Sequence, residues 1–281
     1  MRPYNKAAEF SKHVFLLLIL LLAFLPMLLM VNISLKDNFQ FSQNPLGLTY
    51  PFHWENYLTA WEFMGRTIFN TAFVAGMVTL LSLVLAIGGA FFFARYRMPG
   101  AKFLFFLFVA LMTYPTVANM VPMFSLLSDL ELYNTHFALI LPAVAGAQAL
   151  NIFVLKNFME EIPQDLFDAA EIDGASFYQQ MRFIVLPHVS PVIGALGILL
   201  LVNQWNSFVA PLLYLRDDEL QMLSVALLHF EGEYTKNWGA LMAGYVIASL
   251  PLIVLFFFCM ELFIKGLSSD KTRVPLDSGK L

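Results

Sequence analysis

The chain has 281 residues, of which 59% are hydrophobic and 13% charged, and its formal net charge is −4. A soluble domain usually carries about 25% charged residues, so this composition excludes an ordinary soluble fold. The slightly acidic balance gives no support for nucleic acid as a partner. With Cys259 as the single cysteine, an intrachain disulfide is excluded as well.

The apolar residues are concentrated in six stretches without Asp, Glu, Lys or Arg. Each stretch has the roughly 20 residues that a helix needs to cross a hydrocarbon core of about 30 Å. No clear small-x-small cleavage site follows the first stretch, so we expect a retained helix rather than a signal peptide. We predict an all-α, polytopic membrane protein with one transmembrane domain over residues 1–281. Its six spans are expected at about 14–33, 67–94, 103–128, 132–155, 188–215 and 238–260.

The basic residues predict an orientation, because cytoplasmic loops of membrane proteins carry an excess of Lys and Arg. With six spans, both termini and the loops near 95–102 and 156–182 lie on one side. Of the 16 Lys and Arg residues, only Lys36, Arg66, Arg216 and Lys236 fall on the other side. We therefore expect both termini in the cytoplasm.

The predicted spans lack the buried charges that ion-driven transporters place inside their helices. His136 and His188 lie near predicted span ends, where a structural hydrogen bond is the alternative to a proton relay. The chain contains no G-x-x-x-x-G-K-[ST] phosphate loop, no metal-ligand cluster and no G-x-S-x-G motif. We expect neither catalytic residues nor a metal site, so energy for uphill transport would come from a partner.

The acidic segment 160–187 interrupts the apolar runs. Pro163 and Asp165 favour the first turn of a short helix, Gly174 favours its end, and Ser176 is a good cap for a second helix. These residues alone fit either an amphipathic helix on the membrane surface or a surface that contacts another protein.

The order of residues in this segment resembles a family signature. Asp168-Ala169-Ala170-x-x-Asp173-Gly174-Ala175, followed by Ile184-x-Leu186-Pro187, is similar to the E-A-A…G…I-x-L-P pattern of ABC importer permeases. In that family the segment is a coupling helix that docks into a cleft on a cytoplasmic ATPase. The resemblance assigns ATPase coupling to Asp168, Ala169, Ala170, Asp173, Gly174, Ala175, Leu186 and Pro187. Asp168 stands where the family usually has Glu, which leaves the docking detail at that position open.

Further matches extend the resemblance through residues 32–267 and point to the carbohydrate-importing branch, especially the smaller permease subunit of maltose-type transporters. They are Asn70, Ala94-Arg95-Tyr96, Asn134-Thr135, Gln204-Trp205-Asn206-Ser207-Phe208, Trp238-Gly239 and Met242-Ala243-Gly244. The resemblance implies a type I importer fold in a bacterial or archaeal inner membrane. It also implies a heterodimer with a second permease, two ABC ATPase subunits that hold ATP and Mg, and an extracytoplasmic solute-binding protein. No cofactor is expected on this chain.

Polar and aromatic residues within the spans are candidates for a substrate pathway, because amides bind sugar hydroxyls and aromatic faces stack on sugar rings. They are Tyr114, Asn119, Asn203, Gln204, Trp205 and Asn206. Hydrogen bonds between helices are the alternative role. The loop 216–237, with Phe230 and Tyr234, is expected to face the binding protein, with a solvated connector as the alternative. Two other functions compete with sugar import. One is an importer permease for a non-sugar solute such as a polyamine or phosphate, and the other is a stand-alone channel or secondary carrier.

Overall fold

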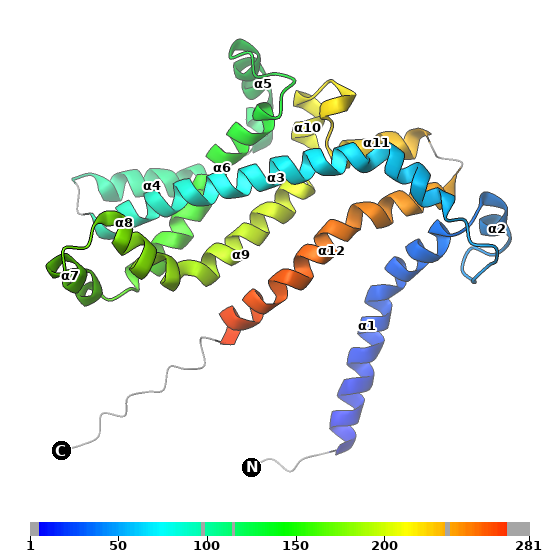
Figure 1. The fold of residues 1–281 in the computed structure, drawn as a ribbon, viewed down its shortest axis with the longest axis horizontal. Coiled ribbons are helices and arrows are strands. Elements are labelled where there is room, and N and C mark those ends of the chain that lie inside the picture. Colours follow the sequence, from blue (N-terminus) through cyan, green and yellow to red (C-terminus); the bar gives the residue numbers. More distant parts are fainter. Residues whose placement is uncertain (1–5, 97–98, 114–115, 234–236, 269–281) are drawn as a thin grey trace. The chain divides into compact units, whose positions relative to one another are not determined.

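A computed structural model gives the fold and describes residues 6–96, 99–113, 116–233 and 237–268 (Figure 1). Every regular element within these residues is helical. The α-helices are α1 (Lys6–Ser34), α2 (Asn38–Gln43), α3 (Glu55–Arg95), α4 (Ala101–Leu111), α5 (Met120–Asp129), α6 (Phe137–Glu160), α7 (Gln164–Ile172), α8 (Phe177–Gln180), α9 (Leu186–Trp205), α10 (Val209–Tyr214), α11 (Leu223–Glu233) and α12 (Trp238–Ser268). Two short 3-10 helices, η1 (Thr116–Asn119) and η3 (Asp218–Leu220), and one π-helix, η2 (Met181–Val185), complete the set.

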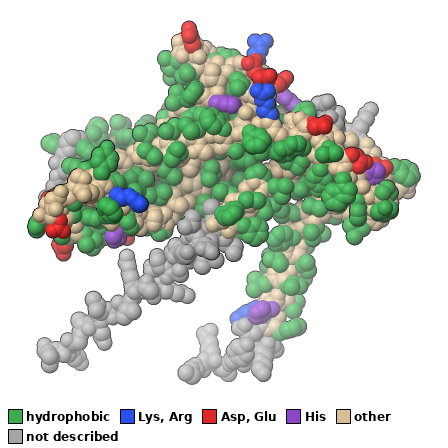
Figure 2. Space-filling view, viewed as in Figure 1, with side chains coloured by type: hydrophobic (Ala, Val, Ile, Leu, Met, Phe, Trp, Pro, Cys, Tyr) green, Lys and Arg blue, Asp and Glu red, His purple; other side chains and the backbone are tan. Residues whose placement is uncertain are grey.

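Five helical segments are long and apolar enough to cross a membrane, which confirms the predicted all-α, polytopic class. They are Phe10–Ser34, Glu55–Arg95, Phe137–Glu160, Phe177–Trp205 and Trp238–Phe258. Hydrophobic side chains cover much of the visible surface of these helices, while charged side chains gather towards their ends (Figure 2). This distribution suits helices that are surrounded by lipid over most of their length.

The prediction of one continuous third span at 103–128 is wrong. The segment is divided into α4, η1 and α5, and α4 has only 11 residues. At 1.5 Å per residue α4 is about 16 Å long, roughly half of a hydrocarbon core. The sequence places Pro115 after α4 and Pro122 in the first turn of α5. Proline lacks an N–H donor and clashes with the preceding turn, which explains the division.

Three other predicted spans have different bounds, and the helix that contains the second begins at Glu55 rather than near 67. The fourth starts at Phe137 rather than near 132, because Asn134 adopts a positive φ of 58° within a turn. The fifth ends at Trp205 rather than near 215. The N–H and the side-chain Nδ2 of Asn206 both bond to the Val202 carbonyl, at 3.2 and 2.8 Å, and the chain then turns. Short polar side chains at 134 and 206 compete with the helical backbone for hydrogen bonds.

Contacts between Cα atoms group the chain into two compact units, each described here by itself. Unit 1 comprises Met1–Arg66 and Ala226–Pro251, and unit 2 comprises Thr67–Val225 and Leu252–Leu281. The single domain expected from the sequence stays a prediction.

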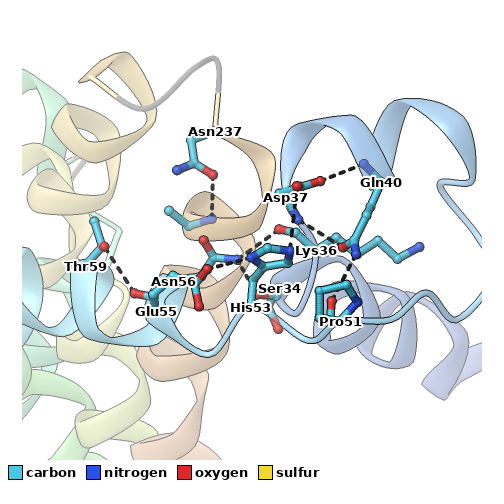
Figure 3. A network of polar contacts seen from close by, with 11 residues as sticks. Ser34, Lys36, Asp37, Gln40, Pro51, His53, Glu55, Asn56, Thr59 and Asn237 are labelled. Atoms are coloured by element: carbon cyan, nitrogen blue, oxygen red, sulfur yellow. Dashed lines mark hydrogen bonds and ion pairs between the residues drawn. The ribbon is translucent and has the colours of Figure 1, made fainter.

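Unit 1 contains a buried polar network between the end of α1 and the start of α3 (Figure 3). Asn56 Nδ2 donates to the carbonyl oxygens of Ser34 and Lys36, both at 2.9 Å. Gly239 of α12 packs directly on this network. A Cβ atom at that position would lie 2.0 Å from the Lys36 carbonyl oxygen. Glycine is therefore required here, because any side chain would push the helix away.

The Lys36 side chain also fixes the adjoining loop. Its Nζ donates to the carbonyl oxygens of Asn44, Pro45 and Gly47 at 2.7, 3.2 and 2.6 Å. Only 1% of the Lys36 surface is exposed, and burial lowers the pKa of its ammonium group. Carbonyl oxygens can satisfy a buried ammonium, whose three N–H groups all donate.

Unit 2 is held together by two apolar clusters. The first joins α3, α6, α7, η2 and α9 and includes Ala86 and Ala90, which have no exposed surface. Small side chains let neighbouring helix backbones approach closely. The second cluster joins α3, α5, α6 and the segment around α10, with Val78 and Ile140 at its centre. The first cluster extends into α7 and so connects the acidic segment to the membrane helices.

Candidate functional site

The segment 160–187 folds as two short helices with a tight turn between them, at the end of α6 and before α9 (Figure 1). Helix α7 follows Pro163, whose ψ of 135° is extended, and carries Asp165 in its first turn. The negative charge of Asp165 complements the partial positive charge of the helix start. The short helices and their positions agree with the sequence prediction.

Gly174 ends α7 in a Schellman motif. The N–H of Ala175 donates to the Ala170 carbonyl at 2.8 Å, and the N–H of Gly174 donates to the Glu171 carbonyl at 3.0 Å. Gly174 has a φ of +73°, which L-residues with a Cβ rarely adopt. Apart from its two chain neighbours, no described residue has an atom within 4 Å of the position that a Gly174 Cβ would occupy. Glycine is thus required by the backbone conformation and not by crowding within the chain.

One face of α7 is fastened to the membrane helices through Phe167 and Arg95. Phe167 is 3% exposed, and its ring centre lies 6.3 Å from that of Phe91 on α3. The Arg95 guanidinium lies 4.0 Å above the Phe167 ring. It also donates to the carbonyl oxygens of Met159 and Ile162 at 2.6 and 2.8 Å, and to Gln164 Oε1 at 3.1 Å. Arg95 therefore links the end of α3, the end of α6 and the start of α7.

The opposite face of α7 is uncovered. Ile172 is 87% exposed and Leu166 is 43% exposed. Among the residues assigned to coupling by resemblance, Asp168, Ala169, Asp173 and Gly174 are exposed, and Ala170 and Ala175 are half-buried. These six lie on one short segment. Leu186 (half-buried) and Pro187 (exposed) belong to the first turn of α9, beyond α8 and η2.

A shallow cavity of about 270 Å³ lies beside the Gly174 turn. Ala170, Asp173, Gly174 and Ala175 line one side, and Gln179, Gln180, Phe183 and Ile184 line the other. The second helix of the segment starts with a capping box of Ser176 and Gln179, in which the Ser176 N–H donates to Gln179 Oε1 at 2.7 Å. The uncovered face and the cavity together form an open surface with small and apolar side chains.

The π-helix η2 joins α8 to α9 just before Pro187. Pro187 cannot donate to a carbonyl of the preceding turn, and a widened turn is one way to accommodate this loss. His188 Nδ1 lies 2.6 Å from the Ile184 carbonyl oxygen, to which it donates. His188 thus makes a structural hydrogen bond, which was the alternative to a proton relay.

The pathway candidates lie in different environments. Asn203 and Asn206 are exposed at the end of α9, while Gln204 and Trp205 are half-buried there. Gln204 lines a cavity of about 160 Å³ together with Ser207 and Tyr214. Asn119 is half-buried in η1, and Tyr114 lies outside the described residues. The four candidates at positions 203–206 are brought together, whereas Asn119 belongs to a separate element.

Phe230 differs from its expected place on an outward-facing loop. It lies in α11 with no exposed surface, 5.0 Å from the Phe63 ring centre to centre. A Cβ on Gly244 would lie 3.0 Å from its ring. The side chain of Phe230 is therefore part of the packing of unit 1. Tyr234 lies outside the described residues, so the loop's expected contact with a binding protein stays a prediction.

Asparagines that contributed only to the resemblance have defined structural roles. Asn134 Nδ2 donates to Asp217 Oδ2 at 2.8 Å, and its Oδ1 accepts the N–H groups of Arg216 and Asp217 at 2.8 and 3.0 Å. Asn70 Nδ2 donates to the carbonyls of Glu219 and Gln221 at 2.9 and 3.0 Å. Within unit 2, these bonds fasten the segment 214–221 to α3 and to the turn before α6. Sequence reasoning assigned no role to either, although Asn tolerates the left-handed backbone found at 134.

These features agree with a comparison of the chain with known protein families. Residues 82–269 match the family described as "Binding-protein-dependent transport system inner membrane component". The chain belongs to this family. It is accordingly a multi-pass membrane component of a transport system. The matched region contains α7, the Gly174 turn and Arg95, whose bonds link α3, α6 and α7.

Curated relatives cover most of the chain. The melibiose/raffinose/stachyose import permease protein MelC of Bacillus subtilis strain 168 is 31% identical over 256 residues, covering 89% of this chain and 91% of the relative. The diacetylchitobiose uptake system permease protein NgcG of Streptomyces coelicolor is 29% identical over 250 residues, covering 87% and 82%. The likeness therefore concerns the whole permease rather than one motif.

A solved structure supports the same fold. A bacterial ABC transporter involved in the import of the acidic polysaccharide alginate contains a chain with a TM-score of 0.79 and 21% identity, covering 93% of this chain and 99% of that one. The predicted type of fold, an ABC importer permease, is confirmed by this likeness.

Proposed function

We propose that this chain is a permease subunit of an ATP-driven importer and that it moves a sugar or oligosaccharide into the cytoplasm. The observation that carries the proposal is the construction of α7, which is fastened on one face by Phe167 and Arg95 and uncovered on the other. Ile172 and Leu166, which are exposed on this short helix, are in a more favourable environment when the membrane surface or another protein covers them. The coupling signature on the same segment indicates an ATPase as that protein.

The rigid attachment of α7 gives the proposal a mechanism. A force on α7 reaches α3 and α6 directly, because Arg95 bonds to the ends of both α6 and α7. If ATP binding draws two ATPase subunits together, α7 moves with its ATPase and the membrane helices rotate as a body. Such a shift requires that ATP binds the closed arrangement more tightly than the open one. ATP and Mg belong to the ATPase, and this chain binds no cofactor.

The remaining partners follow from the same assignment. A second homologous permease completes a heterodimer around the pathway, and an extracytoplasmic binding protein delivers the solute. Both termini and α7 lie on the cytoplasmic side of an inner membrane, in accord with the distribution of Lys and Arg.

Carbohydrate is the favoured solute class for two reasons. The relatives MelC and NgcG carry names of oligosaccharide importers. In addition, Asn203 and Asn206 expose amide groups at the end of an apolar helix, which is costly in lipid and favourable beside water, a sugar or another polar helix. We propose that these two residues face the pathway. Hydrogen bonds to the second permease are the alternative role.

Reconstitution of the transporter in proteoliposomes tests the proposal. The chain is co-expressed with a candidate second permease and a candidate ABC ATPase from the same organism, and ATP hydrolysis is measured with and without a candidate solute-binding protein. We expect hydrolysis to rise only when the binding protein carries an oligosaccharide. Hydrolysis that ignores the binding protein would refute the coupled importer. A binding protein whose thermal stability responds to polyamines or phosphate, and to no sugar, would refute the carbohydrate assignment alone.

A further inference from the structure

A cavity of about 710 Å³ opens beside the junction of α3 and α4 in unit 2, apart from the uncovered face of α7. The end of α3, the first turns of α4, the last turns of α6 and Gln164 at the start of α7 line it. Neither the coupling surface nor the pathway candidates use this cavity.

The charges of the cavity lining are unequal. Among the described lining residues, Arg95, Lys102 and Lys156 contribute positive charge and Glu160 contributes the one negative charge. Glu160 is engaged by Lys156 at 2.7 Å. The three acceptors of Arg95 described above are two backbone carbonyls and an amide oxygen, none of which carries charge. The lining therefore keeps an excess of positive charge that attracts an anion.

Two of the three positive side chains, Arg95 and Lys156, are held in place by their neighbours. The Lys156 ammonium lies 4.7 Å above the Phe105 ring, and its side chain is 15% exposed. Lys102 is exposed in the first turn of α4. No side chain caps the first N–H groups of that helix, which begins at Ala101 in the same lining. These donors add to the attraction for an anion.

The outer surface of α4 shows what kind of molecule carries the anion. No residue of α4 is buried in this chain. Phe103 and Phe106 are each 69% exposed, and Leu107 and Leu111 are 48% and 58% exposed. This apolar helix leads away from the basic cavity at its first turn. A molecule with an anionic head and long apolar chains matches both parts, whereas a soluble phosphate matches only the cavity.

We propose that the cavity is a binding site for the headgroup of an anionic phospholipid whose acyl chains lie along α4. The phosphate contacts Lys102 and the start of α4, close to Lys156 and Arg95. Because Arg95 also holds α7, an occupied site lies next to the connection between α7 and the membrane helices. Basic cavities between membrane helices are suited to such headgroups.

Lipid titration of the full-length chain in neutral detergent, followed by native mass spectrometry, tests this site. Dioleoylphosphatidylglycerol is compared with dioleoylphosphatidylcholine, and glycerol 3-phosphate serves as the soluble headgroup. We expect tighter binding of phosphatidylglycerol than of phosphatidylcholine. Lys102→Gln should weaken phosphatidylglycerol binding about fivefold, the effect of about 1 kcal/mol for one basic residue.

Two further variants control for surface charge and for folding. Arg182→Gln removes an exposed positive charge outside the lining and should leave binding unchanged. Glu160→Gln removes the only carboxylate that the described part of the lining carries and should strengthen phosphatidylglycerol binding, a gain that a folding defect does not produce. Equal losses for Lys102→Gln and Arg182→Gln, or no gain for Glu160→Gln, would overturn the proposal. Displacement of the lipid by glycerol 3-phosphate at equal concentration would show a soluble-phosphate site and overturn it as well.

Discussion

Substitutions at Gly174 separate the strain of the α7 turn from the space that a partner needs. The residue has a φ of +73°, and within the part of the chain that the structure describes only its chain neighbours have atoms within 4 Å of a Cβ placed there. Alanine in this conformation costs about 1 kcal/mol, since L-residues are disfavoured in the left-handed region. Asparagine costs a few tenths of that, because it tolerates left-handed backbone. Thermal stability of the purified chain should therefore fall in the order Gly, Asn, Ala.

ATPase stimulation should follow a different order if an ATPase packs against the Gly174 turn. The asparagine side chain is larger than that of alanine, so it intrudes further into a surface that is open in the isolated chain. We expect Gly174→Asn to lower ATP hydrolysis by the reconstituted transporter at least tenfold, more than Gly174→Ala does. This is the reverse of the order for stability.

The two assays are thermal unfolding in detergent and ATP hydrolysis stimulated by the loaded binding protein. An activity that tracks stability, with Gly174→Asn close to wild type, would show that the turn matters only for its backbone. That result would refute the argument that a partner occupies the space above Gly174.

Variants at three anchor positions, each paired with a comparison variant, test the fold. Arg95→Met removes two charge-assisted hydrogen bonds to backbone carbonyls and should cost about 3 kcal/mol of unfolding free energy. Arg95→Lys can keep one of these bonds and should cost about half as much. Equal losses for the two variants would show that packing on Phe167 dominates. Gly239→Ala places a Cβ 2.0 Å from the Lys36 carbonyl oxygen and should cost more than about 3 kcal/mol of unfolding free energy. A Cβ at Gly146 in α6 meets no described side chain within 4 Å, and alanine favours a helix more than glycine does, so Gly146→Ala should be neutral to slightly stabilising in thermal unfolding. Asn134→Ala and Asn134→Gly both lose the side-chain hydrogen bonds to residues 216–217, but only alanine is strained at a φ of 58°. The Asn134→Ala variant should therefore be about 1 kcal/mol less stable than the Asn134→Gly variant. The opposite order would contradict the left-handed backbone at this position.

The helical class of the fold could be predicted from the sequence because long apolar runs have few alternatives in lipid. Breaks within those runs were harder to place. The run 103–128 contains no charged residue and was therefore predicted as one span, although Pro115 and Pro122 lie within it. At 206, the helix ends because one asparagine bonds to its own helix, which hydropathy does not register.

For the segment 160–187, the local structure could be predicted from the sequence, but its long-range contacts could not. Pro163, Gly174 and Ser176 act through local backbone preferences, so their roles could be read from neighbouring residues. Arg95 acts over a long range, bonding to residues more than 60 positions away. Phe230 was misplaced for the same reason, since its burial depends on α3 and α12, which are distant in the sequence. Sequence patterns indicate which local structure a residue favours, but not which distant residue it meets.

The central claim, that the exposed face of α7 contacts an ATPase, is tested most directly by cross-linking. Ile172→Cys is introduced after replacement of the native Cys259 by serine, and Val121→Cys on α5, which is 80% exposed, serves as the matched control. In membranes that contain the co-expressed ATPase, a short bifunctional reagent should join position 172 to the ATPase and leave position 121 without that product. A cross-link from position 121 but not from position 172, or none from 172 while the complex hydrolyses ATP, would contradict the account.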